Sequence, residues 1–343
     1  ATPLPMDVRQ TTIQITGGEH MFRSMRAFLL VCFLGASLTI ISGGISAVIA
    51  YDIKWGTAPA GGVWQALGTA MVEDIVKSRP GLKGSTMPIG GAANVVAVDS
   101  GKINVAFSFS NTAAEAWEGK EDFKAQGKLQ NIRHLAVLFP EPTQIVVWSD
   151  APFTDILSLK GKRITPGPKG SAIAVVSRYV IEAHGMSLDD FDIKYLSFAE
   201  AGQQFIDGHI DSIFYGAMAY PGPPIVSASS QRKIRLLPLS QDKIKHLITN
   251  HKGLEEYTLP KGAYPGVETE IPGVSAPVVL IAREDMPDEI ANAIVQTIDK
   301  NFEKYSTIVK AMALGKREMM PRDIGVPIHP GAEKYYKAKG WLK

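Results

Sequence analysis

The segment YDIKWGTAPAGGVWQALGTAMVEDI, residues 51–75, joins a predicted strand to a predicted helix through a glycine-rich turn. Ile53 and Trp55 share one face of the strand, as the two-residue period of a β-strand requires. Apolar residues then recur every four positions along one side of the helix: Val63, Leu67, Met71 and Ile75. A strand that passes directly into a helix is typical of α/β proteins built on parallel sheets.

The same order of strand, turn and helix returns further along the chain. Residues 162–165 form a predicted strand, residues 167–171 a turn, and the segment that follows a helix ended by Gly185. Other apolar runs predict further strands: INVAFSF, HLAVLF, QIVVW, DIKYL, DSIFY, KIRLLPL and VVLIA. The alternation predicts an α/β fold in which helices cover parallel sheets.

Two changes of character divide this alternation into two lobes. The linker DAPFTDILS leaves an apolar strand near Ser149, and residues 258–274 hold six prolines and glycines that break regular structure. Residues 51–147 together with 272–343 are therefore predicted to form the first lobe, and residues 148–271 the second. We expect the lobes to be joined by a hinge of two chain segments, whose bending opens and closes a ligand cleft.

Composition and charge limit the classes of function. The chain has 343 residues, of which 45% are hydrophobic and 20% charged, as is ordinary for a soluble globular protein of two domains. Its formal net charge is only +2, and no basic stripe is interleaved with aromatic residues. We therefore expect no nucleic-acid partner.

Residues 21–50 have the three-part layout of a secretory signal peptide. Two arginines precede an apolar stretch, and small residues end the segment at Ala50. The alternative is an uncleaved anchor helix, because the apolar stretch approaches the length that spans a bilayer. Residues 1–20 are polar and aperiodic, and we interpret them as an added or mis-set start that is disordered. Cys32 is the one cysteine, so the exported chain would be free of thiols, which suits a periplasm.

Two turns that begin helices are the candidate ligand-binding sites, one in each lobe. Their residues are Thr57, Gly61, Gly62, Val63 and Trp64 in the first lobe, and Gly170, Ser171 and Ala172 in the second. Exposed N–H groups at a helix start, aided by the helix dipole, hold anions such as a carboxylate. The alternatives are a plain tight turn in the first lobe and, in the second, a serine hydroxyl that only caps its own helix.

Four aromatic or polar residues are further candidates, each with an ordinary alternative. Trp64 either stacks on a ligand or packs in the core. Asn94 and Ser110 lie at the ends of apolar runs, where uncharged donors serve ligands or cap helices. Tyr215 is a cleft residue or a core residue, and the sequence does not decide between them.

The sequence contains no recognisable catalytic or metal-binding motif. Its seven histidines have no paired-ligand spacing, and it has no GxSxG elbow, Walker loop or full GxGxxG fingerprint. We therefore predict that the protein is not an enzyme and uses no metal or cofactor.

Six blocks, taken together, resemble the TAXI family of TRAP transporter solute receptors. They are WGTAPAGGVWQALG, GGAANVVAVDSGKINVAFS, LKGKRITPGPKGSAI, FIDGHIDSIFYGA, LPKGAYPG and PIHPGAEKYYKAKG, within about residues 51–340. The resemblance implies a type II periplasmic binding protein fold, a periplasmic location, and delivery of amino-acid or dicarboxylate-like acids to an ion-driven membrane permease.

The two candidate turns depart from the pattern of that family. Its first ligand turn, usually TGGTGGVYY, falls on residues 57–65, where Trp64 replaces a tyrosine and residues 58–60 differ. Its second element, GSGT, becomes residues 170–173 with the Gly-Ser pair kept and a hydroxyl lost. One side-chain donor fewer implies a less polar ligand or a different pose.

The sequence thus predicts a monomeric, exported receptor that binds a small carboxylate-bearing metabolite and hands it to the membrane subunit of a TRAP transporter. In this hypothesis the ligand carboxylate lies at Ser171, while Thr57 and the turn of residues 61–64 engage it from the first lobe. Two alternatives are a sensor that passes a signal to a membrane kinase, and an enzyme on the same fold that resembles thiamine-precursor synthases.

Overall fold

The structure is a computed structural model that describes residues 50–58 and 63–343. The predicted start at residues 1–20 and the predicted signal peptide at residues 21–50, apart from Ala50, lie outside the described residues. Within the described ranges, no helix is both long enough and apolar enough to cross a membrane.

Five strands form the first sheet, in the order β2-β1-β3-β12-β4. They are β1 (Tyr51–Gly56), β2 (Leu82–Met87), β3 (Val105–Phe109), β4 (Ile132–Phe139) and β12 (Val278–Arg283). β1 pairs in parallel with β2 and β3, whereas β12 runs antiparallel between β3 and β4. A strand from late in the chain therefore returns to the sheet that the early strands begin.

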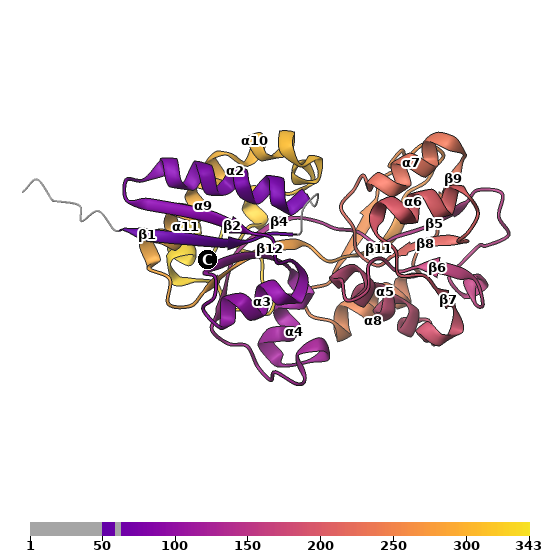
Figure 1. Cartoon of the computed structure of the whole chain (residues 1–343), viewed down its shortest axis with the longest axis horizontal. Helices are drawn as coiled ribbons and strands as arrows, with labels where there is room; N and C mark the ends of the chain where they lie inside the picture. The colour runs from indigo at the N-terminus through magenta and orange to yellow at the C-terminus, as the bar shows by residue number, and fades with distance from the viewer. Residues whose placement is uncertain (1–49, 59–62) are drawn as a thin grey trace, which may run out of the picture. The chain divides into compact units, whose positions relative to one another are not determined.

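Helices cover both faces of this first sheet. Along β3, Val105 and Phe107 pack in the core that includes α2 (Val63–Ser78). Ala106, which lies between them, packs instead in the core that includes α3 (Gly91–Asp99). This alternation follows the period of a strand that is buried on both sides. Figure 1 shows α2 and α3 on opposite sides of the sheet.

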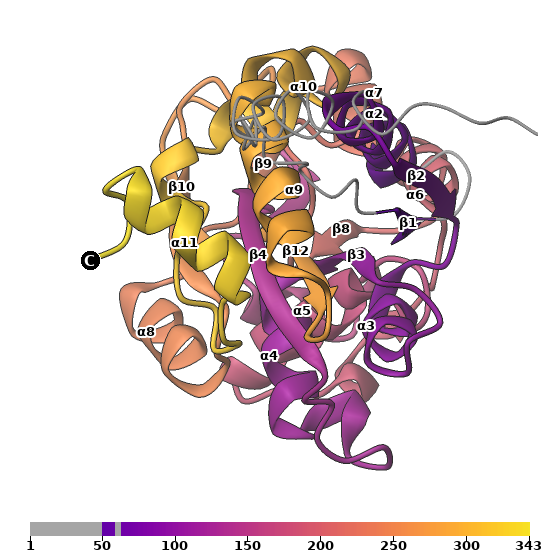
Figure 2. The ribbon, with the colours of Figure 1, turned by 90° about the vertical axis from the view of Figure 1, so that its left-hand side faces the viewer.

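The end of the chain packs on the same lobe. Besides α2 and α3, the helices of this lobe are α4 (Ser110–Glu118), α9 (Asp288–Lys300), α10 (Phe302–Ile308) and α11 (Pro330–Ala338). α11 lies against α9 (Figure 2). The buried Tyr336 of α11 donates its hydroxyl hydrogen to the carbonyl oxygen of Leu135 in β4, at 2.5 Å. This bond fastens the last helix to the edge strand of the sheet.

Five other strands form the second sheet, in the order β7-β6-β8-β5-β9. They are β5 (Gln144–Trp148), β6 (Arg163–Thr165), β7 (Asp192–Ile193), β8 (Ser212–Tyr215) and β9 (Ile234–Leu236). The helices of this lobe are α5 (Ala172–Ala183), α6 (Phe198–Ile206), α7 (Pro223–Gln231) and α8 (Gln241–Asn250). A separate antiparallel pair, β10 (Glu255–Leu259) and β11 (Ile271–Ser275), packs on α8.

Short 3₁₀ helices link several of these elements. They are η1 (Glu121–Phe123), η2 (Leu157–Leu159), η3 (Leu188–Asp190), η4 (Lys310–Leu314) and η5 (Arg317–Met319).

Two extended segments connect the lobes and are bonded to each other, and we call them the hinge: residues 140–143 and 274–277. Pro142 and Ser275 form an antiparallel bridge. On either side of that bridge, the Thr143 N–H donates to the Val274 carbonyl at 2.7 Å, and the Ala276 N–H donates to the Glu141 carbonyl at 3.0 Å. The protein is therefore an α/β protein of two lobes joined by a two-segment hinge.

Two details differ from the sequence prediction. β5 was expected in the first lobe, up to residue 147, but it pairs with β8 and β9 of the second sheet. The chain therefore crosses between the lobes at residues 140–143. The sequence does not locate this crossing, because β4 and β5 are similar apolar strands and only the strands with which they pair distinguish them. Residues 258–274 are not wholly irregular, since β10 ends and β11 begins within them.

Candidate ligand-binding site at the hinge

The predicted first turn is anchored by a buried asparagine. The Asn94 side chain donates from Nδ2 to the carbonyl oxygens of Thr57, at 3.2 Å, and Phe107, at 2.9 Å. Its Oδ1 accepts from the Gly90 N–H at 3.1 Å. Thr57 is itself buried, and its N–H donates to the Met87 carbonyl at 2.8 Å. The structure thus brings Thr57 and Asn94 together. The Asn94 amide, however, is engaged in the hydrogen bonds that connect β1, β3 and the start of α3.

The rest of the predicted first turn divides between the core and the surface. Gly61 and Gly62 lie outside the described residues. Val63 begins α2 and is 40% exposed, whereas Trp64 is only 6% exposed. The Trp64 ring lies 5.1 Å from the ring of Phe109, centroid to centroid. The structure therefore places Trp64 in the core of the first lobe.

Ser110 contacts the opposite lobe directly. It is the first residue of α4, and its hydroxyl donates to the carbonyl oxygen of Gly253 at 2.6 Å. Gly253 has a φ of +86°, and a Cβ there would lie 2.5 Å from the backbone nitrogen of Asn111. Only glycine allows the two backbones to approach so closely. The structure therefore makes Ser110 a contact between lobes.

The predicted second turn keeps free donors at the start of α5. Ser171 is the N-cap of α5, and its Oγ accepts from the Ala174 N–H at 3.2 Å. Its own N–H donates to the Pro168 carbonyl at 3.1 Å, so this N–H is not free for a ligand. The N–H groups of Ala172 and Ile173 donate to no described group. Gly170, with a φ of +74°, shapes the turn before them.

Tyr215 ends β8 close to this second turn. Its side chain is fully buried, burial raises the pKa of its hydroxyl, and that hydroxyl has no hydrogen-bond partner among the described residues. The next residue, Gly216, donates its N–H to Ser177 Oγ of α5 at 2.8 Å. This bond places the end of β8 beside the middle of α5, and no described hydrogen bond or ring contact joins the first-lobe turn to the second-lobe turn.

The hinge holds a buried acid that sequence reasoning missed. Glu141 is 4% exposed, and its carboxyl group makes no ion pair or hydrogen bond with a described residue. Burial raises the pKa of Glu141 to about 8. In the sequence, Glu141 is marked as a charged residue between Pro140 and Pro142, in the short segment that separates two apolar strands.

The neutral polar groups next to it are, by contrast, mostly satisfied. Thr143 Oγ1 lies 2.9 Å from the carbonyl oxygen of Gly216. Gln144 donates from Nε2 to the Met218 carbonyl at 2.8 Å and accepts a short hydrogen bond from the Tyr264 hydroxyl. This network ties the first hinge segment to the second lobe.

A second contact between the lobes surrounds another buried acid, and we call it the α4–α5 contact. Glu115 of α4 is 8% exposed, and its Oε1 accepts from the Tyr179 hydroxyl of α5 at 2.8 Å and from Asn111 Nδ2 at 3.2 Å. The Tyr179 ring stacks on His251, with centroids 3.8 Å apart. Burial raises the pKa of Glu115 to about 7, although the hydrogen bond from Tyr179 acts in the opposite direction.

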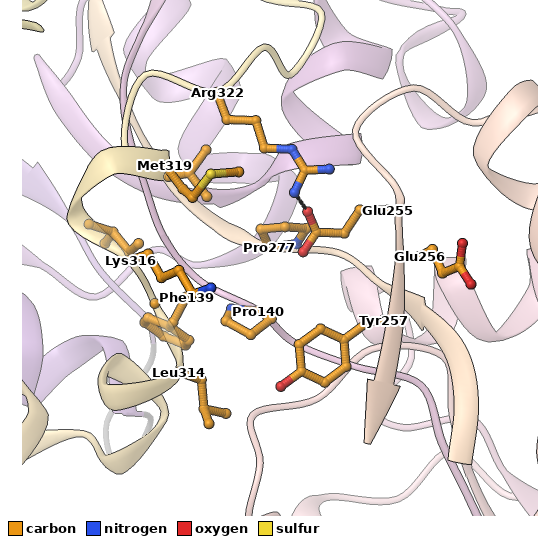
Figure 3. A pocket seen from close by; sticks show the side chains of 13 residues that line it. Phe139, Pro140, Glu255, Glu256, Tyr257, Pro277, Leu314, Lys316, Met319 and Arg322 are labelled. Carbon is orange, nitrogen blue, oxygen red and sulfur yellow. Dashed lines mark ion pairs between the residues drawn. The ribbon is translucent and has the colours of Figure 1, made fainter. Parts of the chain in front are cut away.

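Two pockets are lined by residues of both lobes. The larger has a volume of about 270 Å³ and lies between the end of β4, the segment of residues 314–322, and β10 (Figure 3). In it Arg322 and Glu255 point toward one another as an ion pair. The smaller has a volume of about 50 Å³ and lies beside Glu115 and His251. Among the described residues, none of the predicted site residues lines either pocket.

Comparison with known proteins assigns the chain to a family. The model of the NMT1-like family matches residues 55–340, which is most of the chain. The chain belongs to the NMT1-like family.

This NMT1-like protein is similar in structure to proteins of solute uptake. One similar structure, from Streptococcus mutans, concerns glutathione import through GshT and the cystine importer TcyBC; it is 10% identical, with 79% of this chain and 100% of that chain covered and a TM-score of 0.50. The TctC solute-binding protein from Polaromonas is 19% identical, with 85% and 98% covered and a TM-score of 0.48. The periplasmic aliphatic sulphonate binding protein SsuA from Escherichia coli is 17% identical, with 77% and 79% covered and a TM-score of 0.48.

The first of these similarities agrees with the predicted fold of a two-lobed binding protein. The NMT1-like match is broader than the TAXI resemblance and does not single out that group.

Proposed function

We propose that this NMT1-like protein is an extracytoplasmic receptor that closes around a small carboxylate-bearing solute, an amino acid or a dicarboxylate-like organic acid. The observation that carries the proposal is the hinge, in which residues 140–143 and 274–277 pair as two antiparallel segments between two α/β lobes. A pair of extended segments bends at few backbone positions, so each lobe moves as a rigid body. Closure follows ligand binding because the ligand contacts both lobes only in the closed form.

The carboxylate of the solute is proposed to bind at the start of α5. The N–H groups of Ala172 and Ile173 donate to no described group, and the positive end of the helix dipole lies with them. The Ser171 oxygen accepts from Ala174, but its hydroxyl hydrogen is left to donate to a ligand. Thr57 and the turn of residues 61–64 would then approach from the first lobe.

The receptor is proposed to act in the periplasm, as a monomer, and to deliver its solute to the membrane subunit of a TRAP-type transporter. The layout of residues 21–50 as a signal peptide supports the location. The six blocks that resemble the TAXI family support the transporter class. Reconstitution of the receptor with the TRAP subunit encoded nearest to it, followed by measurement of labelled solute uptake, tests the partner.

The Ser171→Ala variant tests the carboxylate site. Native mass spectrometry of the purified protein first identifies a co-purified solute, and a thermal-shift screen of L-amino acids, succinate, malate and glutarate supplies the probe for calorimetry. A lost charge-assisted hydrogen bond of about 1.5–3 kcal/mol predicts a roughly tenfold to hundredfold weaker Kd.

The matched control is Ser197→Ala. Ser197 caps α6 by the same kind of bond, from the Glu200 N–H at 3.4 Å, so its loss also weakens a helix start. Both variants should lose stability, by about 1 kcal/mol, but only Ser171→Ala should lose affinity. Equal affinity of the two variants for the tightest acid would contradict the assignment.

A further inference from the structure

The larger pocket, of about 270 Å³, lies directly against the hinge. Pro140 of the first hinge segment and Pro277 of the second line it, together with residues from the segment 314–322 of the first lobe and from β10 of the second. Because each lobe supplies a wall, the shape of the pocket depends on the angle between the lobes. A molecule bound there therefore contacts both lobes and the hinge.

This pocket is distinct from the predicted turn of the first lobe. The order of the first sheet makes β4 an edge strand, and β3 and β12 lie between β4 and β1, whose end leads to Thr57. The segment before α11 covers the outer edge of β4. There the Val137 N–H donates to the Met320 carbonyl at 2.9 Å, and the His134 N–H donates to the Pro327 carbonyl at 2.8 Å. The pocket lies against this outer edge, away from the end of β1.

Most residues that line the pocket are apolar, among them Phe139, Pro140, Pro277, Leu314 and Met319. Met319 is 41% exposed, so the chain itself leaves a large apolar side chain uncovered here. Pockets that bind small organic molecules have volumes from about 300 Å³ upward, and they too are mostly apolar. A volume of about 270 Å³ therefore suits a compact molecule with an apolar body.

The two acids that line the pocket already have partners. Glu255 forms the ion pair with Arg322, and its side chain is only 11% exposed. Glu256 points to the other face of β10, because successive side chains of a strand alternate, and it accepts from Gln241 Nε2 at 3.3 Å (Figure 3). The remaining cation of the lining, Lys316, therefore has no acid partner among the described residues.

Two donors at the pocket are left without a described partner. They are the Lys316 ammonium group, from the first lobe, and the Tyr257 hydroxyl, from β10. Figure 3 shows these two side chains on opposite sides of Pro140. A carboxylate accepts from both an ammonium and a phenol hydroxyl. A single cation without a partner matches one negative charge better than the two charges of a dicarboxylate.

We propose that this pocket binds a small monocarboxylate with an apolar body, such as an arylacetate or a branched-chain fatty acid, and that the bound acid restrains the hinge. The carboxylate lies between Lys316 and Tyr257, and the apolar body covers Phe139, Leu314 and Met319. The acid favours the lobe arrangement that forms the pocket, since it contacts both lobes there. The inference goes beyond the proposed function, because it concerns a second site.

The test compares each acid with its uncharged amide on the full chain. The probes are phenylacetate with phenylacetamide and 4-methylpentanoate with 4-methylpentanamide, and the methionine methyl groups carry carbon-13 for NMR. The Met319 signal, assigned with Met319→Leu, should shift on titration with the acid. The signal of Met186, which does not line the pocket, should not shift. The acid should bind at least about threefold more tightly than its amide.

Lys316→Gln should weaken binding of the acid about three- to tenfold and leave binding of the amide unchanged, which removes the preference. Lys310→Gln is the matched control, because Lys310 is an exposed lysine of η4 that has no described partner and does not line the pocket. The site is overturned by an unshifted Met319 signal with both acids at up to about 10 mM. Equal binding of acid and amide, or a Lys316→Gln variant that keeps the preference, overturns it as well.

Hydrogen exchange tests the restraint on the hinge. The N–H groups of Thr143 and Ala276 bond the two hinge segments to each other. A bound acid that contacts both lobes should slow the exchange of these two amides about threefold or more, and should slow it less in Lys316→Gln at the same acid concentration. Exchange that stays unchanged while the Met319 signal shows the pocket to be filled overturns the restraint.

Discussion

Two buried acids lie where the lobes of this protein meet, and their surroundings are opposite. Glu115, in the α4–α5 contact, accepts hydrogen bonds from Tyr179 and Asn111, one donor from each lobe. Glu141, in the hinge, has no described donor at all. Burial raises the pKa of both carboxyl groups, to about 7 for Glu115 and about 8 for Glu141.

The difference separates an acid that both lobes bond from an acid that no described residue bonds. At Glu115 the chain itself replaces the lost water, so the acid contributes to holding the lobes in the arrangement seen. At Glu141 no described residue does so, and a carboxyl that is mostly buried without a bonded partner lowers stability when it is charged. Substitutions in each region separately test this difference.

The largest expected effect is on the pH dependence of ligand-free stability. The pKa of the Glu141 carboxyl is about 8 in the folded protein, above its ordinary value of 4.5, so the folded state binds more protons than the unfolded state between these values. The free energy of unfolding is therefore greatest below pH 4.5 and falls as the pH rises toward 8. Glu141→Gln removes this loss. Urea unfolding at pH 4, 6.5 and 9 should show that the free energy of unfolding of the variant increasingly exceeds that of the wild type as the pH rises, by up to about 5 kcal/mol.

Glu270→Gln serves as the control, because Glu270 is an exposed glutamate of the loop between β10 and β11 with no described partner. Parallel profiles for wild type and Glu141→Gln would mean that the hinge acid has a partner or meets water, and the contrast with Glu115 would disappear.

The next effect concerns the close approach beside the α4–α5 contact. Gly253→Ala puts a Cβ 2.5 Å from the Asn111 nitrogen at a φ of +86°, so we expect the lobes to part and the protein to lose about 2–4 kcal/mol of stability. Gly262→Ala is the matched control, because its φ is +80° but no atom lies within 4 Å of the added Cβ. Small-angle scattering should show a larger radius of gyration for Gly253→Ala only; equal unfolding midpoints would contradict the contact.

A smaller effect is expected from the hydroxyl that satisfies Glu115. Tyr179→Phe keeps the ring on His251 but removes the 2.8 Å hydrogen bond, at a cost of about 1–3 kcal/mol. The pKa of Glu115 should rise further above 7, because that bond favours its charged form. Carbon-13 NMR titration of the glutamate carboxyls measures the shift. Tyr195→Phe, at an exposed ring without a described hydrogen bond, should change neither quantity.

The smallest effect is expected at the rim of the same contact. Lys252 pairs with Glu118 at 2.5 Å, but its side chain is 63% exposed. Exposed ion pairs contribute about 0.2–1 kcal/mol and are screened by salt. Lys252→Gln should therefore shift stability by less than about 1 kcal/mol at low salt and not at all in 1 M NaCl. A larger loss that does not depend on salt would show that this ion pair contributes as much stability as the hydrogen bond to Glu115.

Local features of the chain could be predicted well from sequence. Ser171 caps α5 and the capping box of Ser197 and Glu200 begins α6, as their spacing predicts. Both depend on groups within four residues of each other. The lobe to which β5 belongs could not be predicted, because its apolar pattern matches a buried strand of either sheet and distant strands decide the pairing.

The candidate site was predicted only in part for the same reason. The α5 turn keeps free donors, but Asn94 and Trp64 are committed to the first lobe, and Ser110 meets Gly253 across 143 residues of sequence. No pattern of residue types indicates which polar group finds its partner so far away.

The sequence by itself determined the strand–turn–helix units and the two α/β lobes, because side-chain period and helix caps act over a few residues. Only the tertiary structure decided which polar groups are satisfied. Glu115 and Glu141 are both glutamates near apolar segments, yet one receives donors from two lobes and the other receives none. The reason is physical: the energy of a buried charge depends on what the folded chain brings within hydrogen-bonding distance.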